Sequence, residues 1–278
     1  MKLNNYIGIV ILNYNSYADT IEQYIKYKMQ TEVELRFYIV DNNSTDESVE
    51  LLHDYFFGVD NCQFIISNIN GGYAKGNNIG IQAAINDGIK YLVISNNDIT
   101  FKDNRLLYKL RESYIDDKMA FISPTMIVGD NKFVGSKINT LKDDIISLLG
   151  KNKKELYSEN NTIETEIVPG SFIFSTTDKF KLFDFFDERT FLYCEERILA
   201  KKVKLQSKYR NYIISELSYL HEEGGVINDN YKKFGKMKLL CDSRIVFYSF
   251  YSHGYEKYLG VFVHKIFRYL FSFLERIS

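Results

Sequence analysis

The chain has 278 residues, of which 45% are hydrophobic and 26% are charged, and its formal net charge is −1. This composition is typical of a globular protein and argues against a disordered chain, while the near-zero charge argues against nucleic acid as a partner. The three cysteines, Cys62, Cys194 and Cys241, are too far apart to predict a disulfide framework or a zinc site, which fits a reducing cytoplasm. We expect neither a signal peptide nor a transmembrane helix, because a strand-like pattern begins near the N-terminus and no run of about 18 apolar residues exists.

The first hundred residues alternate between short apolar runs and amphipathic segments. Apolar runs that predict strands buried on both faces of a sheet cover residues 7–12, 35–40, 63–66 and 91–95. Helices are predicted after the first three runs, over residues 16–29, 44–57 and 79–87. Ser44 and Glu47 have the spacing of a capping box, which places the start of the second helix. This alternation predicts an α/β fold with a doubly wound, mostly parallel central sheet and helices on both faces.

The second half of the chain is less regular. It predicts helices over residues 104–116 and 195–204, and strands over residues 119–123, 167–174 and 218–221. Residues from about 135 to 162 are polar and predict a mobile insertion. Two helices are expected to finish the chain. We therefore divide it into a first domain, residues 1–225, and a C-terminal helical extension, residues 226–278.

The last predicted helix has an apolar side and a polar side. Apolar residues recur at helical spacing at Leu259, Phe262, Val263, Ile266, Phe267, Leu270, Phe271 and Leu274. Polar residues are predicted on the other side, at Lys257, His264, Lys265, Arg268 and Glu275. Two interpretations stay open. The helix either packs on the domain, or it lies in the plane of a membrane surface with a cationic polar face.

Polar side chains follow each of the four apolar runs at its carboxyl end. They lie in residues 13–16, 41–46, 70–78 and 96–98. In an open α/β sheet the ligand binds beyond the carboxyl ends of the strands. Asp98, held at such an end beside two amides, is suited to a hard cation, and the cation would in turn hold a diphosphate. The alternative is that residues 96–98 form only a polar turn.

Two further features of these loops bear on the ligand. Asp41 could accept a hydrogen bond from a nucleobase, with the backbone of residues 13–15 lining the base, although capping of a helix would also explain it. Gly71, Gly72 and Gly76 permit close approach of the backbone to a ligand. The segment lacks the Gly-Lys-Ser/Thr of an NTPase loop, and Gly-x-Gly-x-x-Gly is absent after the first strand, which argues against NTPase and NAD-binding sites.

Candidate catalytic groups come from the second half. Glu195 and Glu196 follow the aromatic run of residues 191–193, and a carboxylate that aromatic neighbours partly desolvate is a better base. The alternative is an exposed acidic start of a helix. His221 ends a predicted strand and could reach a metal or a phosphate, or serve only the structure.

Six segments in this order resemble glycosyltransferase family 2 with the GT-A fold, close to its rhamnosyltransferase-like, capsular and O-antigen branch. They are residues 10–15, 40–46, 70–80, 96–98, 169–171 and 191–196. The resemblance implies inverting transfer of a sugar from a UDP- or dTDP-sugar, with rhamnose as one candidate. The acceptor would be a hydroxyl of a growing, lipid-linked bacterial surface polysaccharide. The protein would be cytoplasmic and peripheral on the inner face of the cell membrane.

The resemblance also assigns roles to individual residues. Glu196 is implied as the general base, Asp41 as a ligand of the nucleobase, and Asp98 with His221 as ligands of Mg²⁺ or Mn²⁺. The other residues implied in binding the nucleotide sugar are Asn13, Tyr14, Asn15, Asn43, Gly72, Lys75, Asn78, Asn96, Asn97, Gly170 and Glu195.

Three positions depart from the family pattern. The family usually has Glu-Asp where this chain has Glu195 and Glu196, and Ile198 stands where a second Asp is common. The stretch after His221 also lacks the usual Gly/Ser pattern. Two other functions stay open: a non-catalytic nucleotide-sugar-binding protein, and a sugar nucleotidyltransferase, which would need a basic, Gly-rich loop where residues 13–16 are neutral.

Overall fold

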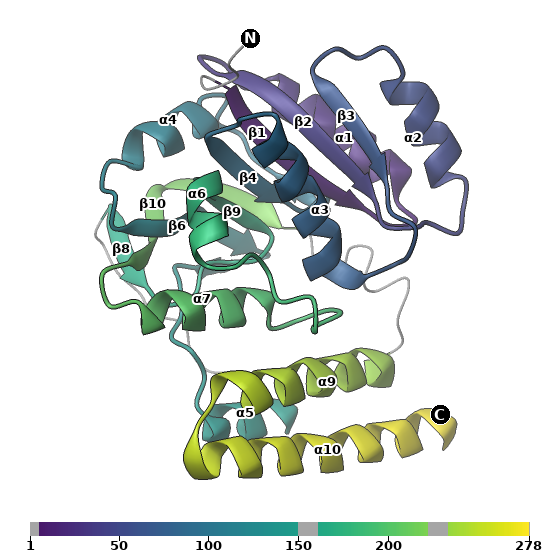
Figure 1. Ribbon diagram of the computed structural model, residues 1–278, viewed down its shortest axis with the longest axis vertical. Helices are drawn as coiled ribbons and strands as arrows, with labels where there is room; N and C mark the ends of the chain where they lie inside the picture. Colours follow the sequence, from purple (N-terminus) through teal and green to yellow (C-terminus); the bar gives the residue numbers. More distant parts are fainter. Residues whose placement is uncertain (1–5, 150–160, 222–232, 278) are drawn as a thin grey trace.

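A computed structural model describes residues 6–149, 161–221 and 233–277 of the protein. It contains one large sheet with helices packed against it and a pair of long helices at one end of the molecule (Figure 1). The α/β class, the central and mostly parallel sheet and the C-terminal helices expected from the sequence are confirmed.

The first four strands form the parallel part of the sheet. These strands, in the spatial order β3-β2-β1-β4, are β3 (Cys62–Ile66), β2 (Glu34–Asp41), β1 (Tyr6–Asn13) and β4 (Tyr91–Ser95). Asn13 lies opposite Asp41, and Ile11 lies opposite Ser95. This register brings the polar residues that follow the three central strands to the same edge of the sheet.

The remaining strands continue the sheet with mixed directions. β9 (Phe172–Thr176) runs antiparallel to both β4 and β6 (Met119–Val128), and β10 (Arg210–His221) runs parallel to β6. Three short strands add to this part by antiparallel pairing: β5 (Ile99–Thr100), β7 (Asn131–Phe133) and β8 (Thr162–Thr165). The sequence placed the start of β9 at residue 167, five residues too early, because Pro169 has no amide hydrogen for a strand ladder. It also placed only the last four residues of β10 in a strand.

Helices cover both faces of the sheet, and each face has its own core. Alternate side chains of a strand point to opposite faces, so Ile9 joins one core and Val10 joins the other. Helices α1 (Tyr17–Lys28), α2 (Ser48–Phe56) and α4 (Leu106–Ser113) pack on the first face. Helices α3 (Gly72–Asn86), α6 (Thr177–Leu182) and α7 (Glu195–Leu205) pack on the second.

Two helix starts differ from the expectations. The capping box predicted at Ser44 and Glu47 is wrong, because the Ser44 hydroxyl donates to Asp41 and α2 begins only at Ser48. Helix α3 begins at Gly72, inside the segment predicted as a loop. Its glycines are typical of loops, but here they let the helix pack closely on β1: a Cβ added at Gly76 would lie 2.3 Å from a methyl carbon of Leu12.

The segment predicted as a mobile insertion contains ordered structure on the part that is described. Helix α5 (Leu141–Leu148) starts with a capping box between Thr140 and Asp143. Its polar appearance comes partly from Asp144, which is fully buried and neutralised by an ion pair with Arg197 of α7. Residues 150–160 lie outside the described part, so the prediction there is not tested.

The chain ends in two antiparallel helices, α9 (Lys233–Tyr251) and α10 (Gly254–Ile277), as expected. The boundary proposed between residues 225 and 226 lies outside the described residues. Helix α9 packs on α5 and α7 through Phe247 and Tyr248, whereas α10 forms the outermost layer (Figure 1). The prediction that His264 lies on a polar side of α10 is wrong. His264 is fully buried, and its ring stacks on Tyr248.

Candidate active site

A buried polar network joins the carboxyl ends of β1, β2 and β4. The Asp41 carboxylate accepts hydrogen bonds from the Asn13 amide at 2.7 Å and from the Ser44 hydroxyl at 2.6 Å. The Asn13 side-chain oxygen Oδ1 in turn accepts from the Thr20 hydroxyl at 2.8 Å, and the Asn97 side-chain amide donates to that hydroxyl at 3.0 Å. Asn13, Asp41 and Thr20 are fully buried, so these groups hold the loops in place. The contact between Asp41 and a nucleobase stays a prediction.

A possible cation site lies beyond β4, where Asp98 meets the end of β10. The antiparallel pairing of β5 with β10 puts His221 opposite Ile99, and the His221 Nε2 atom lies 3.2 Å from Asp98 Oδ1. That carboxylate oxygen is buried, and no hydrogen bond of suitable geometry reaches it. An oxygen and an imidazole nitrogen that face each other in this way fit a divalent cation such as Mn²⁺ or Mg²⁺.

The protein supplies at most a partial ligand set for such a cation. In the part of the chain that the structure describes, no three side chains of His, Cys, Asp or Glu converge on one point. Asp98 and His221 would therefore need a bound diphosphate and water to complete the coordination, which is usual for Mg²⁺.

A cavity of about 450 Å³ opens beside this pair. Five of the residues predicted from the sequence line it: Asn96, Gly170, Glu195, Glu196 and His221. They come from the residue after β4, from the turn before β9, from the start of α7 and from the end of β10. The structure thus brings residues from distant parts of the chain to one hollow at the carboxyl edge of the sheet.

The two glutamates at the start of α7 are held in an unusual environment. Glu195 is buried, and burial together with the charge of Glu196 raises the pKa of Glu195 to about 8. Burial also raises the pKa of Glu196. The two preceding residues, Tyr193 and Cys194, have φ values of 73° and 68°, a left-handed conformation that is uncommon for residues other than glycine. Strained backbone next to carboxylates with shifted pKa values is typical of functional sites.

Two contacts with α3 fix this segment. The backbone amide of Tyr73 donates to the Phe191 carbonyl oxygen at 2.8 Å, and the Tyr73 hydroxyl donates to the Gly170 carbonyl oxygen at 2.6 Å. Gly72 has a φ of +79°, and a Cβ there would lie 2.0 Å from the same Phe191 oxygen. This close approach to the protein's own backbone requires glycine at position 72, and the predicted role of Gly72 in binding the nucleotide sugar stays a prediction.

The other predicted donor-site residues lie outside the lining of this cavity. Asn15 exchanges hydrogen bonds with Thr45 across the β1 and β2 loops. Asn78 binds the backbone of Phe186, which ties α3 to the loop before α7. Tyr14 and Lys75 are half-buried, and Asn43 is exposed with a φ of 60°.

Sequence reasoning missed several residues of the site. Tyr73 stood inside a recognised segment, yet its hydroxyl was given no role. Arg197, Leu240 and Arg244 also line the cavity, and the last two come from α9. The sequence signal for Arg197 was its position next to Glu196, whereas nothing local to Leu240 or Arg244 indicates that α9 reaches the site.

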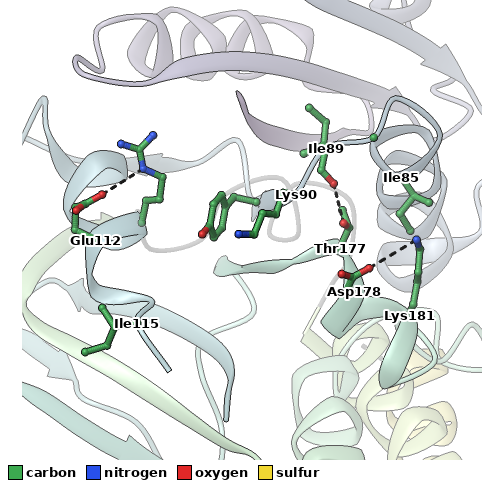
Figure 2. Close-up of a pocket in the computed structure, with 11 residues that line it drawn as sticks. Ile85, Ile89, Lys90, Glu112, Ile115, Thr177, Asp178 and Lys181 are labelled. Atoms are coloured by element: carbon green, nitrogen blue, oxygen red, sulfur yellow. Dashed lines mark hydrogen bonds and ion pairs between the residues drawn. The ribbon is translucent and has the colours of Figure 1, made fainter. Parts of the chain in front are cut away.

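A larger cavity of about 920 Å³ lies at the opposite, amino-terminal edge of β4 (Figure 2). It is an open hollow lined by Lys90, Arg111 and Lys181 among others. Arg111 pairs with Glu112 at 3.5 Å, and Lys181 pairs with Asp178 at 3.9 Å. None of the residues predicted to carry chemistry lines it, so size alone does not make it the active site.

Comparison with known proteins agrees with this geometry. Residues 8–179, more than half of the chain, match the family described as Glycosyl transferase family 2. The low-salt glycan biosynthesis hexosyltransferase Agl10 of Haloferax volcanii is 26% identical to this chain over 196 residues. The alignment covers 68% of this chain but 59% of that relative, so the chain spans less than two thirds of the relative's length.

Solved structures share the fold at low sequence identity. The mannosyltransferase PcManGT from Pyrobaculum calidifontis, in complex with GDP-Man and Mn²⁺, has a TM-score of 0.63 at 12% identity, over 96% of this chain and 70% of its own. TarS 1-349 from S. aureus, in complex with UDP-GlcNAc, has a TM-score of 0.57 at 17% identity, over 92% of this chain and 70% of its own. These likenesses confirm the fold class expected from the sequence.

Proposed function

Because the chain belongs to glycosyltransferase family 2, we propose that it transfers a sugar from a nucleoside diphosphate sugar to an acceptor hydroxyl, with inversion at the anomeric carbon. The observation that carries this proposal is the cavity in which Glu196, with its raised pKa, faces the same space as Asn96 and His221. A proton acceptor and the side chains suited to hold a diphosphate thus share one hollow.

The reaction would be a single in-line displacement. Glu196 accepts the proton of the acceptor hydroxyl, whose oxygen bonds to the anomeric carbon from the side opposite the diphosphate. The bond between the anomeric carbon and the diphosphate oxygen breaks, and the nucleoside diphosphate leaves with the electron pair. The raised pKa of Glu196 strengthens it as a base at a pH where it is ionised.

Asp98 and His221 would hold the divalent cation, Mg²⁺ or Mn²⁺, together with oxygens of the diphosphate. The mannosyltransferase relative was solved with Mn²⁺, which supports a divalent cation in this fold. When bound, the cation supplies positive charge to the departing diphosphate.

The donor would lie across the ends of β1, β2 and β4. Asp41 is satisfied by Asn13 and Ser44, so we assign it to holding the loops that receive the base rather than to direct contact. Tyr14 and Asn43, which are more accessible, are then the better candidates for contact with the base. UDP- and dTDP-sugars, including dTDP-rhamnose, remain the donors that we propose from the sequence resemblance.

The acceptor that we propose is a lipid-linked saccharide at the inner face of a bacterial cell membrane. The cavity is also lined by apolar groups, including Met126, Phe133 and Leu240. Such a lining suits a molecule with an apolar part better than a free hexose.

The test of the donor reaction is release of nucleoside diphosphate. The protein is incubated with UDP-, dTDP- or GDP-sugars, Mn²⁺ and a panel of saccharides linked to a phytanyl diphosphate. We expect release with at least one donor, and a loss of at least about 100-fold in Glu196→Gln, consistent with removal of a general base. Binding of the diphosphate, measured by thermal shift, is expected to be retained in this variant because Glu196 acts on the acceptor.

Other products would contradict the proposal. Release of pyrophosphate from a sugar phosphate and a nucleoside triphosphate would identify a sugar nucleotidyltransferase. Binding of sugar nucleotides without turnover across the whole panel would favour a non-catalytic binding protein. Full activity in Glu196→Gln would remove the assigned base.

The cation is tested separately by binding. Mn²⁺ is expected to increase the thermal shift that UDP or GDP produces, since ligands that bind the folded state stabilise it. Asp98→Asn should abolish this Mn²⁺-dependent part, whereas Asp54→Asn, an exposed carboxylate on α2, should leave it unchanged. An undiminished Mn²⁺ effect in Asp98→Asn would exclude Asp98 as a ligand.

A further inference from the structure

Helix α10 has two apolar faces, and only one of them is used by the fold. Phe271 and Val261 on the inner face pack against the neighbouring helices, and Gly260 lies so close to the ring of Tyr248 that a Cβ there would be 2.4 Å from it. The outer face carries exposed large apolar side chains at Tyr255, Tyr258, Leu259, Phe262, Ile266, Tyr269, Leu270 and Phe273.

These side chains form a continuous stripe. They recur at intervals of three or four residues, so they share one side of the helix. Phe262 is 61% exposed and Tyr269 is 78% exposed, which shows that nothing in the described chain covers them. From Tyr255 to Phe273 the stripe runs about 27 Å, at 1.5 Å per residue. An exposed apolar surface of this length is typical of an interaction site.

The charges around the stripe have one sign. By helical spacing Lys265 and Arg276 lie on its margin, and Lys265 is exposed. The two carboxylates of α10 belong to the inner side: Glu256 is four residues before Gly260, and Glu275 pairs with Lys238 of α9. Within the described part of α10, the outer face therefore combines aromatic and aliphatic groups with cations and has no carboxylate.

We propose that this outer face of α10 binds an anionic membrane, with the helix lying in the plane of the lipid headgroups. Aromatic and aliphatic side chains would enter the boundary between headgroups and acyl chains, and the tyrosine hydroxyls would stay at the headgroup level. Lys265 and Arg276 would contact lipid phosphates. The helix cannot do this by spanning, because no helix in the described ranges is both long and apolar enough to cross a bilayer.

A second copy of the chain is a poorer fit to the same face. The stripe is centred near residue 264, so a two-fold axis at its middle would bring Lys265 close to the Lys265 of the copy. Because Lys265 lies on the margin of the stripe, the two ammonium groups would face each other at the rim of that interface, and such juxtaposed like charges disfavour the pairing. A membrane surface with anionic headgroups instead complements the charges of Lys265 and Arg276.

The position of α10 connects the membrane to the active site. Helix α9, which pairs with α10 along its length, contributes Leu240 and Arg244 to the wall of the cavity. The hairpin would thus present the acceptor side of the cavity near the membrane in which a lipid-linked acceptor resides. Only this last step rests on the proposed function, since lipid binding itself requires no catalysis.

The experiment is flotation of the full-length protein with vesicles. We expect binding to vesicles of phosphatidylcholine with 30% phosphatidylglycerol, and at least about tenfold weaker binding to phosphatidylcholine alone. Phe262→Asp with Tyr269→Asp should lower binding to anionic vesicles at least about tenfold, because it removes two of the inserted rings. Lys265→Glu with Arg276→Glu should abolish the preference for anionic lipid.

The matched control is a pair of exposed apolar residues elsewhere. Phe57→Asp with Ile115→Asp changes side chains that are at least as exposed, directly after α2 and after α4, and should leave vesicle binding unchanged. Melting temperatures and size-exclusion profiles of all variants are recorded. Failure of the wild type to float with anionic vesicles, or equal binding by Phe262→Asp with Tyr269→Asp, would overturn the proposal. So would a dimer that this variant dissociates, because the stripe would then be a protein interface.

The result of the vesicle experiment can be distinguished from the result of the transferase assay. Nucleoside diphosphate release with a short, water-soluble acceptor needs no vesicle. Activity without flotation would refute the membrane face alone, whereas flotation without activity would refute the transferase alone.

Discussion

At the residue scale, burial raises the pKa values of the adjacent carboxyl groups of Glu195 and Glu196. Glu195 is buried, and one of its carboxyl oxygens has no hydrogen-bond partner. Its pKa of about 8, caused first by burial and then by the charge of Glu196, means that the pair keeps a proton near neutral pH. Burial of such groups is costly for the fold and useful for proton transfer.

The cost of burying an ionised Glu195 predicts how the free energy of unfolding depends on pH. Between the ordinary pKa of 4.5 and the raised pKa of about 8, the folded state binds a proton at Glu195 that the unfolded state has lost. The free energy of unfolding should therefore fall as the pH rises through this window. Glu195→Gln removes the ionisation, so we expect this variant to melt above the wild type at pH 8.5, by about 2–4 °C for each kcal/mol gained.

Scanning calorimetry at two pH values checks this expectation. At pH 5 the folded wild type has a protonated, neutral Glu195, so the two proteins should melt at similar temperatures. A difference of the same size at pH 5 and pH 8.5 would show that the effect comes from packing of the amide and that Glu195 titrates normally.

At the scale of elements, the start of α3 positions the start of α7. Gly72 at the first turn of α3 touches the Phe191 carbonyl oxygen, and the Tyr73 amide donates to the same oxygen. The segment from Phe191 then leads, through two left-handed residues, to Glu196. A shift of the Phe191 backbone would therefore move the proposed base.

Two glycines allow this coupling to be tested with a matched control. Gly72 and Gly88 lie just inside and just beyond the two ends of α3, with φ values of +79° and +76°. A Cβ at Gly88 would meet nothing within 4 Å, so Gly88→Ala should cost only about 1–2 kcal/mol for the left-handed conformation. Gly72→Ala also forces a Cβ onto the Phe191 carbonyl and should cost more.

Activity distinguishes the two variants further. A displacement of about 1 Å at a catalytic group can cost about 100-fold in rate, so Gly72→Ala should lower release of nucleoside diphosphate far more than Gly88→Ala. Urea unfolding gives the stability of each variant, and assays are made where both remain folded. Equal losses of stability and activity in the two variants would mean that the contact with Phe191 has no role in positioning α7.

The elements also show what local sequence patterns can and cannot predict. The apolar runs of β1, β2 and β4 were readable because strands buried on both faces need uninterrupted apolar residues. The run from Phe172 to Thr176 is equally apolar, but nothing in it encodes that β9 runs antiparallel. Likewise, glycine has a low helix propensity, so Gly76 on its own indicates a loop. It lies in a helix because α3 packs closely on β1 at this position.

The same distinction between local patterns and long-range contacts applies to the candidate site. Glu196, Asp98 and His221 were recognisable from short motifs, each at the end or start of an element. Asp98 and His221 lie close together because β5 pairs with β10, which is a long-range contact. Asp41 was recognised as polar and well placed, but its burial against Asn13 and Ser44 could not be read from spacing.

At the scale of the whole molecule, one buried carboxylate joins the C-terminal hairpin to the catalytic unit. Asp144 of α5 accepts a hydrogen bond from Arg197 of α7 at 2.7 Å and another from the Tyr248 hydroxyl of α9 at 2.7 Å. Arg244 of α9 donates to the Asp144 backbone carbonyl at 3.1 Å. Asp144 is fully buried, and the two guanidinium groups are nearly so. Three segments that are distant in sequence thus meet at one charge.

This arrangement makes Asp144 a strong test of how the hairpin is held. Asp144→Ala leaves two buried guanidinium groups without their carboxylate, and breaking a buried pair in this way typically costs about 3–5 kcal/mol. Because Arg197 directly follows Glu196, we expect lower transferase activity as well as lower stability. Urea unfolding, together with hydrogen exchange of the backbone amides of α9, measures how firmly the hairpin stays docked.

The control for this prediction removes the charge from both sides. Asp144→Leu combined with Arg197→Met replaces the ion pair by apolar groups, leaving only Arg244 with a charge to accommodate, and should recover part of the lost stability. Asp178→Ala, an exposed carboxylate on α6 that pairs with Lys181, should change stability by less than about 1 kcal/mol. If Asp144→Ala unfolds at the same urea concentration as the wild type, the hairpin is held by Phe247 and the other apolar contacts alone. In that case the buried ion pair would contribute nothing measurable to the docking of α9 and α10.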